Sequence, residues 1–488
     1  MAKPMINKHR ENPLHFIKYI FIGLFLLVVS KPFSVSAQKI KSDNPSLVDA
    51  FNLAVNTVDI NVRRGVLAAG GDYGGEWVRD IAINSWNCAS LLRPQVAENS
   101  LWSVTIKKDS VGHQYWDKNI WTIAAMNHYK VTGDKAFLVS AYRCAKNTMK
   151  DLEHFTYDEK YGLFMGPSVF NDGIAGYPAS VYDSLNNSSF VLDHPRSHTI
   201  KCLSTNAVYF EAYKALAEMS AILNDGQKDA FNQKAMALKT QILKYLYNEK
   251  ENKFYYLIDS KGKIDQSQEA LGVSFAILFG IVDTRQAAGI VSHATTSSHG
   301  IPSITPDFER YSAEKPGRHN RVIWPIVNGF FAKAAIATKN YAVFTAELDN
   351  LTHLALDEDK GNYNFREIYN ADTGLPDGGW QRKATANEFH WESLKNQTWS
   401  ATAYLNMVLT GVVGLKFEPD YLSITPFLPD DVHSLTINEL KYRNTTLNIT
   451  ITGKGDHVSS FTINGKKQKE IKVYATATGI QNININLN

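Results

Sequence analysis

Between residues 44 and about 415 the sequence alternates helical stretches with short polar turns, and this pattern restricts the fold more than any other feature. Apolar residues recur three and four positions apart through 121–131 and 135–155, as on the buried face of a helix. Between these stretches, Gly133 suits the end of one helix and Asp134 the cap of the next. Further helices are predicted from Asn44 onward and at 206–224, 228–247, 268–280, 284–291, 322–338, 341–356 and 398–409.

These stretches predict five to six helical hairpins. A hairpin cannot bury both of its faces alone, so successive hairpins have to stack or curl around a common axis. No fixed repeat length is visible in the sequence, which argues against a regular solenoid. We therefore expect a mainly α fold in which the hairpins close into a toroid of paired helices. Its long loops, gathered at one end, would carry the site.

After residue 416 the period of the pattern changes. Apolar and polar residues alternate in several short runs, as in half-buried strands, and Asn464-Gly465 and Gly453-Lys-Gly455 suit hairpin turns. We predict a small C-terminal antiparallel β-sandwich over residues 416–488, after a catalytic domain over residues 38–415. The β-sandwich is expected to be structural, with carbohydrate binding as the alternative.

The first 37 residues have the pattern of a secretory signal peptide. A basic segment ends at Lys18, an apolar run follows over 19–29, and small residues precede a cleavage site after Ala37. The apolar run is shorter than the roughly 20 residues that a membrane span requires. We therefore expect a periplasmic or secreted protein that has no membrane attachment after cleavage.

Charge and motif content exclude several classes of function. Removing residues 1–37 takes away five Lys or Arg and one Glu, so the formal net charge falls from +3 to −1. Such a chain has no long-range field that attracts nucleic acid. Three scattered cysteines form no disulfide framework, and no phosphate-binding loop, nucleophile elbow or His-Glu-x-x-His helix is present. We expect no nucleic-acid partner, no metal and no cofactor.

Two aromatic-rich stretches, of which the first is also rich in glycine, combine groups that suit sugar binding. In the first, 70–86, Trp77 precedes Arg79 and Asp80, which would offer a stacking face and paired hydrogen bonds. In the second, 115–121, Trp116 stands beside Asp117 at the start of a predicted helix. Either aspartate could instead serve only as a helix cap.

Two further stretches offer the carboxyl groups of an acid–base pair. Asp172 lies between glycines, and the flanking Phe170 and Tyr177 would desolvate its carboxyl and favour the protonated form, as a general acid requires. A plain Asn-Asp-Gly turn is the alternative. Glu367 follows Arg366, which would keep it ionised as a base, and Asp377 is the competing candidate. Two distant carboxyl groups in aromatic loops suit glycoside hydrolysis.

These residues, in this order, resemble the six-hairpin (α/α)6-barrel glycosidases, and most of all glycoside hydrolase family 63 with the related trehalases and mannosylglycerate hydrolases. The resemblance covers roughly residues 50–415. It rests on these motifs: Trp77-Val-Arg-Asp80, the Trp-Asp-Lys-Asn-Ile-Trp run at 116–121, Phe170-Asn-Asp-Gly173, Trp324-Pro-Ile-Val-Asn-Gly329, Glu367-Ile-Tyr-Asn-Ala-Asp-Thr-Gly374 and Trp399-Ser-Ala401.

By position, the resemblance makes Asp172 the general acid and Glu367 the general base. The sequence departs from the family where Gly-Pro-Ser-Val-Phe-Asn precedes Asp172 in place of Glu-Ser-Gly before a Trp- or Met-Asp. A second departure is at the first site, where the family has a Trp-Asp pair and this sequence has Trp77-Val-Arg-Asp80. Both departures bear on which sugar is bound more than on which reaction is catalysed. The tail from Leu422 to Pro429 resembles the C-terminal sandwiches of family 65 phosphorylases and α-L-rhamnosidases.

Relatives of this kind mostly act with inversion on α-linked terminal sugars. The resemblance therefore implies a secreted, inverting, exo-acting glycoside hydrolase of α-glucosidase type, which removes terminal α-linked sugars from oligo- or polysaccharides. Its two carboxyl groups should stand roughly 6.5–9.5 Å apart, which leaves room for a water molecule. At least half of the nine tryptophans should form sugar-stacking walls. The expected substrate-binding residues are Trp77, Arg79, Asp80, Trp116, Asp117, Trp324, Asn328, Tyr369 and Trp391.

Other functions remain open at this level. An α-L-rhamnosidase, a trehalase or a glycoside phosphorylase could share the fold, although a phosphorylase needs a phosphate site where Glu367 stands. A non-catalytic glycan-binding protein is the alternative from a different class. A lyase would need a Tyr or His base and several arginines for an acidic sugar, which the near-neutral charge does not favour.

Overall fold

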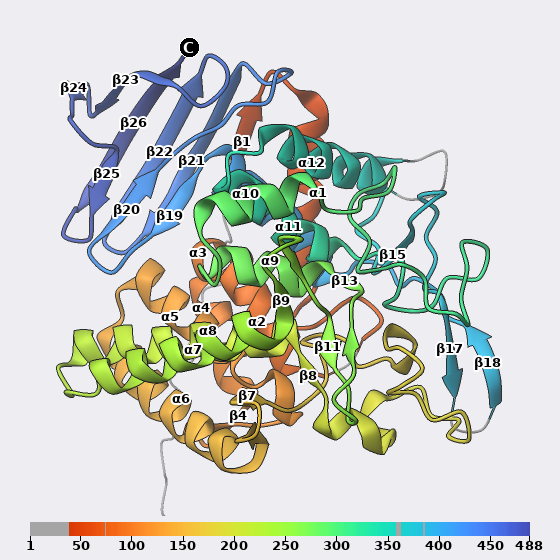
Figure 1. The fold of residues 1–488 in the computed structure, drawn as a ribbon. Helices are drawn as coiled ribbons and strands as arrows, with labels where there is room; N and C mark the ends of the chain where they lie inside the picture. The colour runs from red at the N-terminus through yellow and green to blue at the C-terminus, as the bar shows by residue number, and fades with distance from the viewer. Residues whose placement is uncertain (1–38, 74, 358–362, 384–385) are drawn as a thin grey trace, which may run out of the picture. The chain divides into compact units, whose positions relative to one another are not determined.

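The structure, a computed structural model, describes residues 39–73, 75–357, 363–383 and 386–488. The predicted signal peptide and its cleavage site after Ala37 lie outside these residues. The described part of the chain is rich in helices and ends in β-strands, as the sequence predicts (Figure 1). No helix in these described ranges has both the length and the apolar character needed to span a bilayer.

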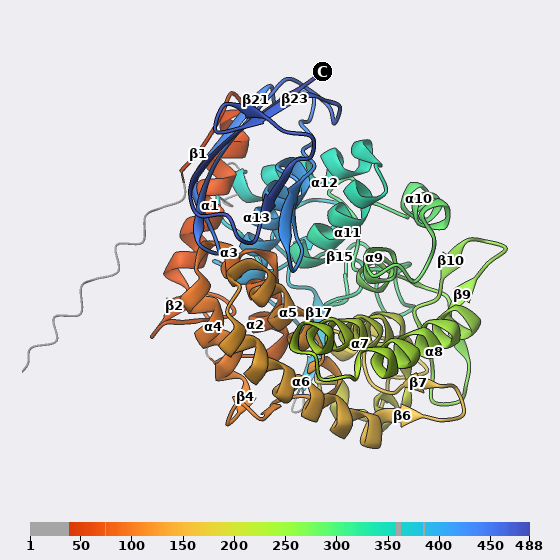
Figure 2. The same ribbon diagram turned by 90° about the vertical axis from the view of Figure 1, so that its left-hand side faces the viewer.

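Within the described residues, six helices contact one another in sequence order, and the last contacts the first. A second set of six lies outside them, each packed against one or two of the inner helices (Figure 2). The inner helices are α2 (Val78–Asn84), α5 (Ile120–Thr132), α7 (Leu203–Leu223), α9 (Ala270–Leu278), α11 (Pro325–Ala337) and α13 (Thr398–Asn406). The outer helices are α1 (Pro45–Ile60), α4 (Pro94–Ser103), α6 (Lys135–Thr156), α8 (Lys228–Leu246), α10 (Thr284–Ser292) and α12 (Tyr341–Leu356).

The helix ends show why the chain turns where it does. Gly133 ends α5 in the left-handed conformation, at φ 74°, where a residue with a side chain would be strained. The Asp134 carboxylate then accepts hydrogen bonds from the backbone N–H groups of Ala136 and Phe137 and so caps α6. The predicted end of one helix and start of the next are confirmed at this turn.

The inner helices present buried side chains on almost every face, whereas the outer helices are amphipathic. In α7 nearly all residues up to Ser220 are buried, and α11 is buried from Pro325 to Ala335 except at Lys333. Helix α6 instead buries only one stripe, which includes Phe137, Ala141 and Met149. A helix that is apolar on all sides has to lie in the interior, so this difference explains which helices form the inner set.

Two sheets follow the helices. The larger has the order β1-β21-β22-β26-β23-β24 and the smaller has the order β19-β20-β25 (Figure 1). Their strands are β1 (Lys39–Ser42), β19 (Leu415–Phe417), β20 (Tyr421–Ile424), β21 (Ser434–Tyr442), β22 (Thr445–Thr452), β23 (Val458–Ile463), β24 (Lys466–Lys467), β25 (Lys472–Tyr474) and β26 (Gly479–Leu487). In β22, Leu447, Ile449 and Ile451 are buried while their neighbours are partly exposed, which is the period-two pattern of a strand.

The sheets depart from the prediction in two respects. The expectation of purely antiparallel pairing is wrong for β22 and β26, which run parallel because the intervening chain crosses over through β23, β24 and β25. In addition, β1 pairs antiparallel with β21, with Ile40 opposite Ile437. Residues from the start of the predicted catalytic domain thus complete the edge of the C-terminal sheet.

Gly414 forms the tight joint between the helical part and β19, and this predicts a large loss of stability on substitution. It has φ 75°, and an added Cβ would lie 1.9 Å from the carbonyl oxygen of Thr425. We expect Gly414→Ala to lower the free energy of unfolding by about 3 kcal/mol, from backbone strain and steric overlap. Urea denaturation measures this loss.

Gly465 provides the matched control for Gly414→Ala. It has the same φ of 75° in the β23–β24 turn, but an added Cβ would meet no atom within 4 Å. Gly465→Ala should therefore cost only the backbone strain, about 1–2 kcal/mol. Equal losses in the two variants would contradict the steric role assigned to the joint at Gly414.

Candidate active site

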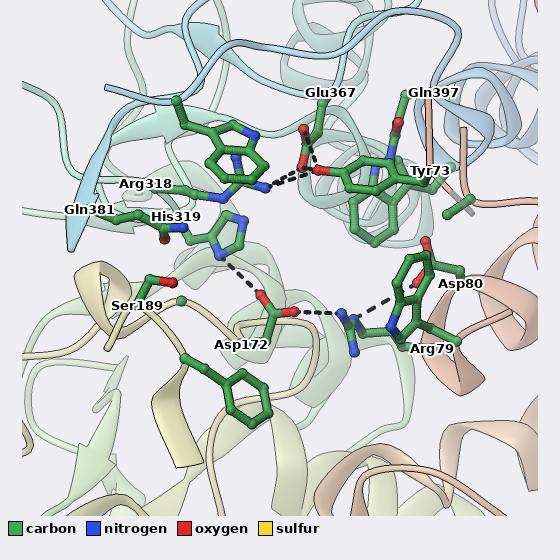
Figure 3. Close-up of a pocket in the computed structure, with 16 residues that line it drawn as sticks. Tyr73, Arg79, Asp80, Asp172, Ser189, Arg318, His319, Glu367, Gln381 and Gln397 are labelled. Atoms are coloured by element: carbon green, nitrogen blue, oxygen red, sulfur yellow. Dashed lines mark hydrogen bonds and ion pairs between the residues drawn. The ribbon is translucent and has the colours of Figure 1, made fainter. Parts of the chain in front are cut away.

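A pocket of about 190 Å³ opens at the N-terminal ends of the inner helices and is bordered by the loops that precede them. Figure 3 shows Asp172, Arg79 and Asp80 on one side of this pocket and Glu367, Arg318 and Tyr73 on the other. The lining residues are Ala69, Tyr73, Trp77, Arg79, Asp80, Asp172, Gly173, Ser189, Phe190, Arg318, His319, Glu367, Gln381, Trp391, Gln397 and Trp399.

Asp172 lies in the long connection before α7, and backbone hydrogen bonds hold its loop. The Asp172 carbonyl accepts from the Val191 N–H at 2.8 Å, which ties it to the segment that carries Phe190. One carboxylate oxygen accepts a hydrogen bond of 2.6 Å from Arg79 Nη2. The side chain of Asp172 is 32% exposed, whereas that of Arg79 is 6% exposed. The carboxylate therefore faces the open pocket while its guanidinium partner is buried behind it.

Arg79 joins three aspartates. Its Nη1 lies 3.4 Å from Asp117 Oδ2 and its Nε lies 3.9 Å from Asp80 Oδ2, in addition to the bond with Asp172. Burial raises the pKa of Asp80 to about 7 and that of Asp117 to about 6, although the charge of Arg79 opposes both shifts. One guanidinium thus supports a cluster of acidic groups at the base of the pocket.

Glu367 is brought to the pocket by a short pair of strands. In β15 (Val322–Ile323) and β16 (Tyr369–Asn370), Val322 lies opposite Asn370, which fixes the loop before β15 beside the loop before β16. Arg318, from the first loop, donates a hydrogen bond of 2.6 Å to Glu367 Oε1. Two chain segments about fifty residues apart thereby supply a carboxylate and its arginine.

The Glu367 carboxylate also accepts hydrogen bonds from the Tyr73 hydroxyl, 3.1 Å from Oε1 and 3.0 Å from Oε2. Burial raises the pKa of Glu367, while the charge of Arg318 and the Tyr73 hydroxyl lower it. The Trp391 ring covers the Arg318 guanidinium at 4.5 Å. The carboxylate is therefore fixed in position and retains contact with the pocket.

His319 stands between the two carboxyl groups (Figure 3). Its Nδ1 lies 3.1 Å from Asn171 Oδ1 and 4.0 Å from Asp172 Oδ1. The ring stacks on Trp324 with the centroids 4.2 Å apart and the planes 3° from parallel. Burial, together with the positive charges of Arg318 and Arg79, holds the pKa of His319 well below its usual value, so the ring is neutral.

Two reasons given for the predicted carboxyl groups are wrong. Phe170 and Tyr177 are fully buried below the loop and do not border the pocket; Phe190 is the aromatic residue that lies there beside Asp172. Likewise Arg366, the sequence neighbour of Glu367, instead donates to the Ser393 carbonyl oxygen at 3.0 Å. In both cases tertiary packing, not sequence adjacency, determines which group contacts the carboxylate.

The structure brings six of the predicted residues to one pocket. Asp172 and Glu367 lie there with Trp77, Arg79, Asp80 and Trp391. The competing base candidate, Asp377, does not line the pocket and instead lies 2.7 Å from His390 Nε2.

Five predicted substrate-binding residues do not line this pocket. Asp117 is buried behind Arg79, and Trp324 lies behind His319. Trp116 is fully buried in a hydrophobic cluster. Asn328 donates to the carboxylate of the buried Glu347 at 2.8 Å, and the buried Tyr369 hydroxyl donates to the Asn364 carbonyl oxygen. Asp117, Trp116 and Trp324 therefore pack against lining residues from behind, whereas Asn328 and Tyr369 bond to residues outside the pocket lining.

Several lining residues were missed in the sequence. Arg318 and His319 shortly precede the Trp324-Pro motif, and two adjacent basic residues in a loop that leads into a helix were an available signal. Tyr73 lies within the glycine-rich stretch 70–86 and Gln397 lies beside Trp399-Ser-Ala401, but nothing in the sequence distinguishes either residue. Ser189 offers no sequence signal at all, because it reaches the pocket only through folding of the connection before α7.

The tryptophans are mostly structural, contrary to expectation. Trp77, Trp391 and Trp399 line the pocket. Trp121 is fully buried in the main hydrophobic core. Trp86 packs against this core, and its ring centroid lies 5.1 Å from that of Phe330. The prediction that at least half of the nine form sugar-stacking walls is therefore wrong, because only three line the pocket and others, such as Trp86, Trp116 and Trp121, pack in hydrophobic clusters.

The fold is similar to those of several solved structures. A protein described as a sialidase matches with a TM-score of 0.66 and 14% identity, over 86% of this chain and 39% of that one. A family GH78 rhamnosidase of Bacillus sp. GL1 matches with a TM-score of 0.57 and 14% identity, over 85% and 42%. The chain thus spans about two fifths of the length of these two proteins.

A third structure matches over nearly its whole length. The GH63 mannosylglycerate hydrolase from Thermus thermophilus, in complex with glucose, has a TM-score of 0.55 and 16% identity, over 72% of this chain and 98% of that one. No curated protein sequence matches significantly. The family described as mannosylglycerate hydrolase MGH1-like glycoside hydrolase domain matches residues 90–400, more than half of the chain. The chain therefore belongs to this glycoside hydrolase family, as its resemblance to family 63 predicts.

Proposed function

We propose that the protein is an inverting, exo-acting glycoside hydrolase that releases terminal α-linked sugars, with Asp172 as the general acid and Glu367 as the general base. One observation carries this proposal: the two carboxyl groups face one pocket from separate loops, each hydrogen-bonded to its own buried arginine. Paired carboxyl groups on opposite sides of a sugar are the machinery of glycoside hydrolysis.

In the proposed reaction, protonated Asp172 gives its proton to the glycosidic oxygen as the bond from this oxygen to the anomeric carbon breaks. A water molecule attacks the anomeric carbon from the opposite face and loses a proton to Glu367. The products are a free sugar of inverted configuration and the leaving alcohol. Asp172 then regains a proton from solvent and Glu367 loses one. This geometry requires a separation of roughly 6.5–9.5 Å between the carboxyl groups.

The size of the pocket supports exo action. Its volume of about 190 Å³ is below the ~300–1,000 Å³ of pockets that hold drug-sized ligands, so it suits a single sugar ring. Trp77 and Trp391 would provide stacking faces, and Arg79 and Asp80 would bond the sugar hydroxyls. The α-glucosidase type rests on the resemblance to family 63.

We further infer that the six inner and six outer helices form an (α/α)6 toroid and that the two C-terminal sheets form a sandwich. The sequential contacts of α2, α5, α7, α9, α11 and α13, with α13 also against α2, support the toroid. Buried residues on both sheets, such as Leu422 and Ile449, support the sandwich.

An α-L-rhamnosidase is the second candidate, because the Bacillus rhamnosidase matches over 85% of this chain, against 72% for the mannosylglycerate hydrolase. A panel of α-linked gluco-, manno-, galacto- and rhamno-substrates, with mannosylglycerate included, distinguishes these candidates. We expect release of a single sugar from the chain end of one of them. Internal cleavage of an end-blocked oligosaccharide would contradict exo action.

Replacing Tyr73 with Phe tests how Glu367 is prepared as a base. The Tyr73 hydroxyl lowers the pKa of Glu367, so its removal should raise that pKa further. A base has to be ionised, and activity is therefore lost as the pH falls through this pKa. The acidic limb of the profile of kcat/KM against pH should move upward by about 0.5–1 pH unit, the equivalent of one hydrogen bond.

Tyr474→Phe is the control for this measurement. Tyr474 is an exposed tyrosine of β25, so its replacement should leave the profile unchanged. If the acidic limb of the kcat/KM profile lies at the same pH in Tyr73→Phe and in the wild type, the ionisation of Glu367 does not determine that limb.

We also propose that the protein is exported to the periplasm or the medium. The basic, apolar and small-residue segments of residues 1–37 support this proposal. N-terminal sequencing of the protein from its native compartment should give Gln38 as the first residue. An intact Met1 would contradict export through cleavage at Ala37.

A further inference from the structure

A second cavity, of about 220 Å³, lies toward the C-terminal ends of the inner helices, away from the catalytic pocket. Helix α5 contributes Met126 and Lys130 from its second half, and α11 contributes Lys333 near its end. Strand β19 contacts α5, and its Leu415 and Phe417 also line the cavity. The cavity therefore lies between the helical part and the C-terminal strands.

Two π-helical segments border this cavity. Helix α2 continues into a π-helix over Ser85–Ala89, and α13 continues into another over Met407–Val412. Trp86 and Asn87 of the first segment and Thr410 of the second line the cavity. Such segments are rare in globular proteins and frequently mark functional sites. Two of them at one cavity suggest selection for binding.

Lys333 is the unusual charge in this cavity. Its Nζ lies over the Trp86 ring, 5.2 Å from the centroid, and among the described residues it forms no ion pair. Burial alone lowers the pKa of Lys333 to about 8. A partly buried ammonium without a carboxylate is costly, so this position is explained if a ligand supplies the missing negative charge.

The acidic groups of the cavity already have other partners. Glu218 pairs with Lys130 at 2.9 Å, and Glu211 pairs with Lys214 at 3.1 Å. Lys416 at the rim is 73% exposed and pairs with Glu418. With each carboxylate matched to a lysine, Lys333 leaves one positive charge uncompensated in the cavity.

The remaining lining indicates what else the ligand carries. The side-chain amide of Asn87 makes no hydrogen bond to another described residue and can bond a hydroxyl group. Met126, Leu409 and Phe417 supply apolar surface. The shape and chemistry fit a small molecule that combines an anionic group, hydroxyl groups and a carbon skeleton.

We propose that this cavity is a second ligand site, separate from the catalytic pocket, which binds a small hydroxylated organic anion with its carboxylate or phosphate on Lys333. The anion pairs with the ammonium group over Trp86, and its hydroxyl groups bond Asn87. The site gives the C-terminal strands a role in ligand binding, because β19 closes the cavity over the helical ring.

Isothermal titration calorimetry of the full-length mature protein tests this site. The probes are gluconate, glycerol 3-phosphate and inorganic phosphate, against neutral glucitol and glycerol at matched ionic strength. We expect saturable binding of at least one organic anion and none of the neutral compounds. Lys333→Met should weaken that binding about 10- to 100-fold, through loss of a charged hydrogen bond. Gluconate and glycerol 3-phosphate distinguish a carboxylate from a phosphate ligand.

Lys416→Met is the matched control, since it removes a lysine from the rim of the same cavity and should leave the affinity unchanged. Absence of binding by all three anions, or equal binding to wild type and Lys333→Met, would overturn the proposal. If Lys333→Met does not fold, amine acetylation of the wild type at pH 8 decides the matter. The bound anion should protect Lys333 and not Lys416, and equal labelling of Lys333 with and without the anion contradicts the site.

Discussion

Asp172→Asn should lower kcat/KM on a sugar-linked substrate by about 100- to 10,000-fold, the contribution of a general acid. The amide has nearly the shape of the carboxyl group but cannot transfer its proton to the glycosidic oxygen. On an aryl glycoside with an acidic leaving group the loss should be much smaller, because such a group departs without protonation. Steady-state kinetics on both substrates give the two ratios.

Asp372→Asn is the control for this variant. Asp372 forms an ion pair of 2.6 Å with Arg321, and neither residue lines the pocket. Its replacement should leave kcat/KM unchanged on both substrates. Equal losses on both substrates in Asp172→Asn would mean that Asp172 does not act as the acid. No loss on either substrate would show that Asp172 takes no part in catalysis.

Glu367→Gln should lower kcat/KM by about 100- to 10,000-fold on the aryl and the sugar-linked substrate alike. Activation of water is needed whatever the leaving group, so an acidic leaving group cannot compensate for the lost base. The glutamine carbonyl oxygen can still accept the hydrogen bond from Arg318, which preserves the shape of the pocket. Kinetics on the same two substrates make the comparison with Asp172→Asn direct.

Two checks accompany this variant. Glu392→Gln alters an exposed glutamate of the same region and should retain full activity. The loss of a negative charge leaves Arg318 buried without its counter-ion, so melting temperatures have to show that Glu367→Gln is folded at the assay temperature. A variant that loses activity only on the sugar-linked substrate would reverse the roles assigned to the two carboxyl groups.

Much of the fold is predictable because local signals agree with the tertiary structure. The turn at Gly133 and Asp134, the long helices α6 and α7 and the hairpin at Asn464-Gly465 form where the sequence indicates. The pairing of β1 with β21 is not predictable in this way. It joins residues about 400 positions apart, and a four-residue edge strand carries no periodicity of its own.

The sequence predicts the two carboxyl groups of the candidate site better than it predicts the side chains that hold them. Asp172 and Glu367 stand in motifs that a resemblance can identify, but the arginines that hold them come from other segments, Arg79 and Arg318. The pairing of β15 with β16 brings Arg318 to Glu367, whereas sequence adjacency favours Arg366. The prediction of Trp116 and Trp324 as sugar contacts fails for a similar reason, since a motif does not show whether a side chain faces the core or the pocket.

The stereochemistry of hydrolysis tests the central claim most directly. Proton NMR during the first minutes of cleavage of an α-linked substrate, before mutarotation, distinguishes the two anomers of the released sugar. With Asp172 as acid and Glu367 as base on opposite sides of the sugar, the first product should be the β-anomer. Initial release of the α-anomer would contradict the inverting mechanism and the roles assigned to both carboxyl groups.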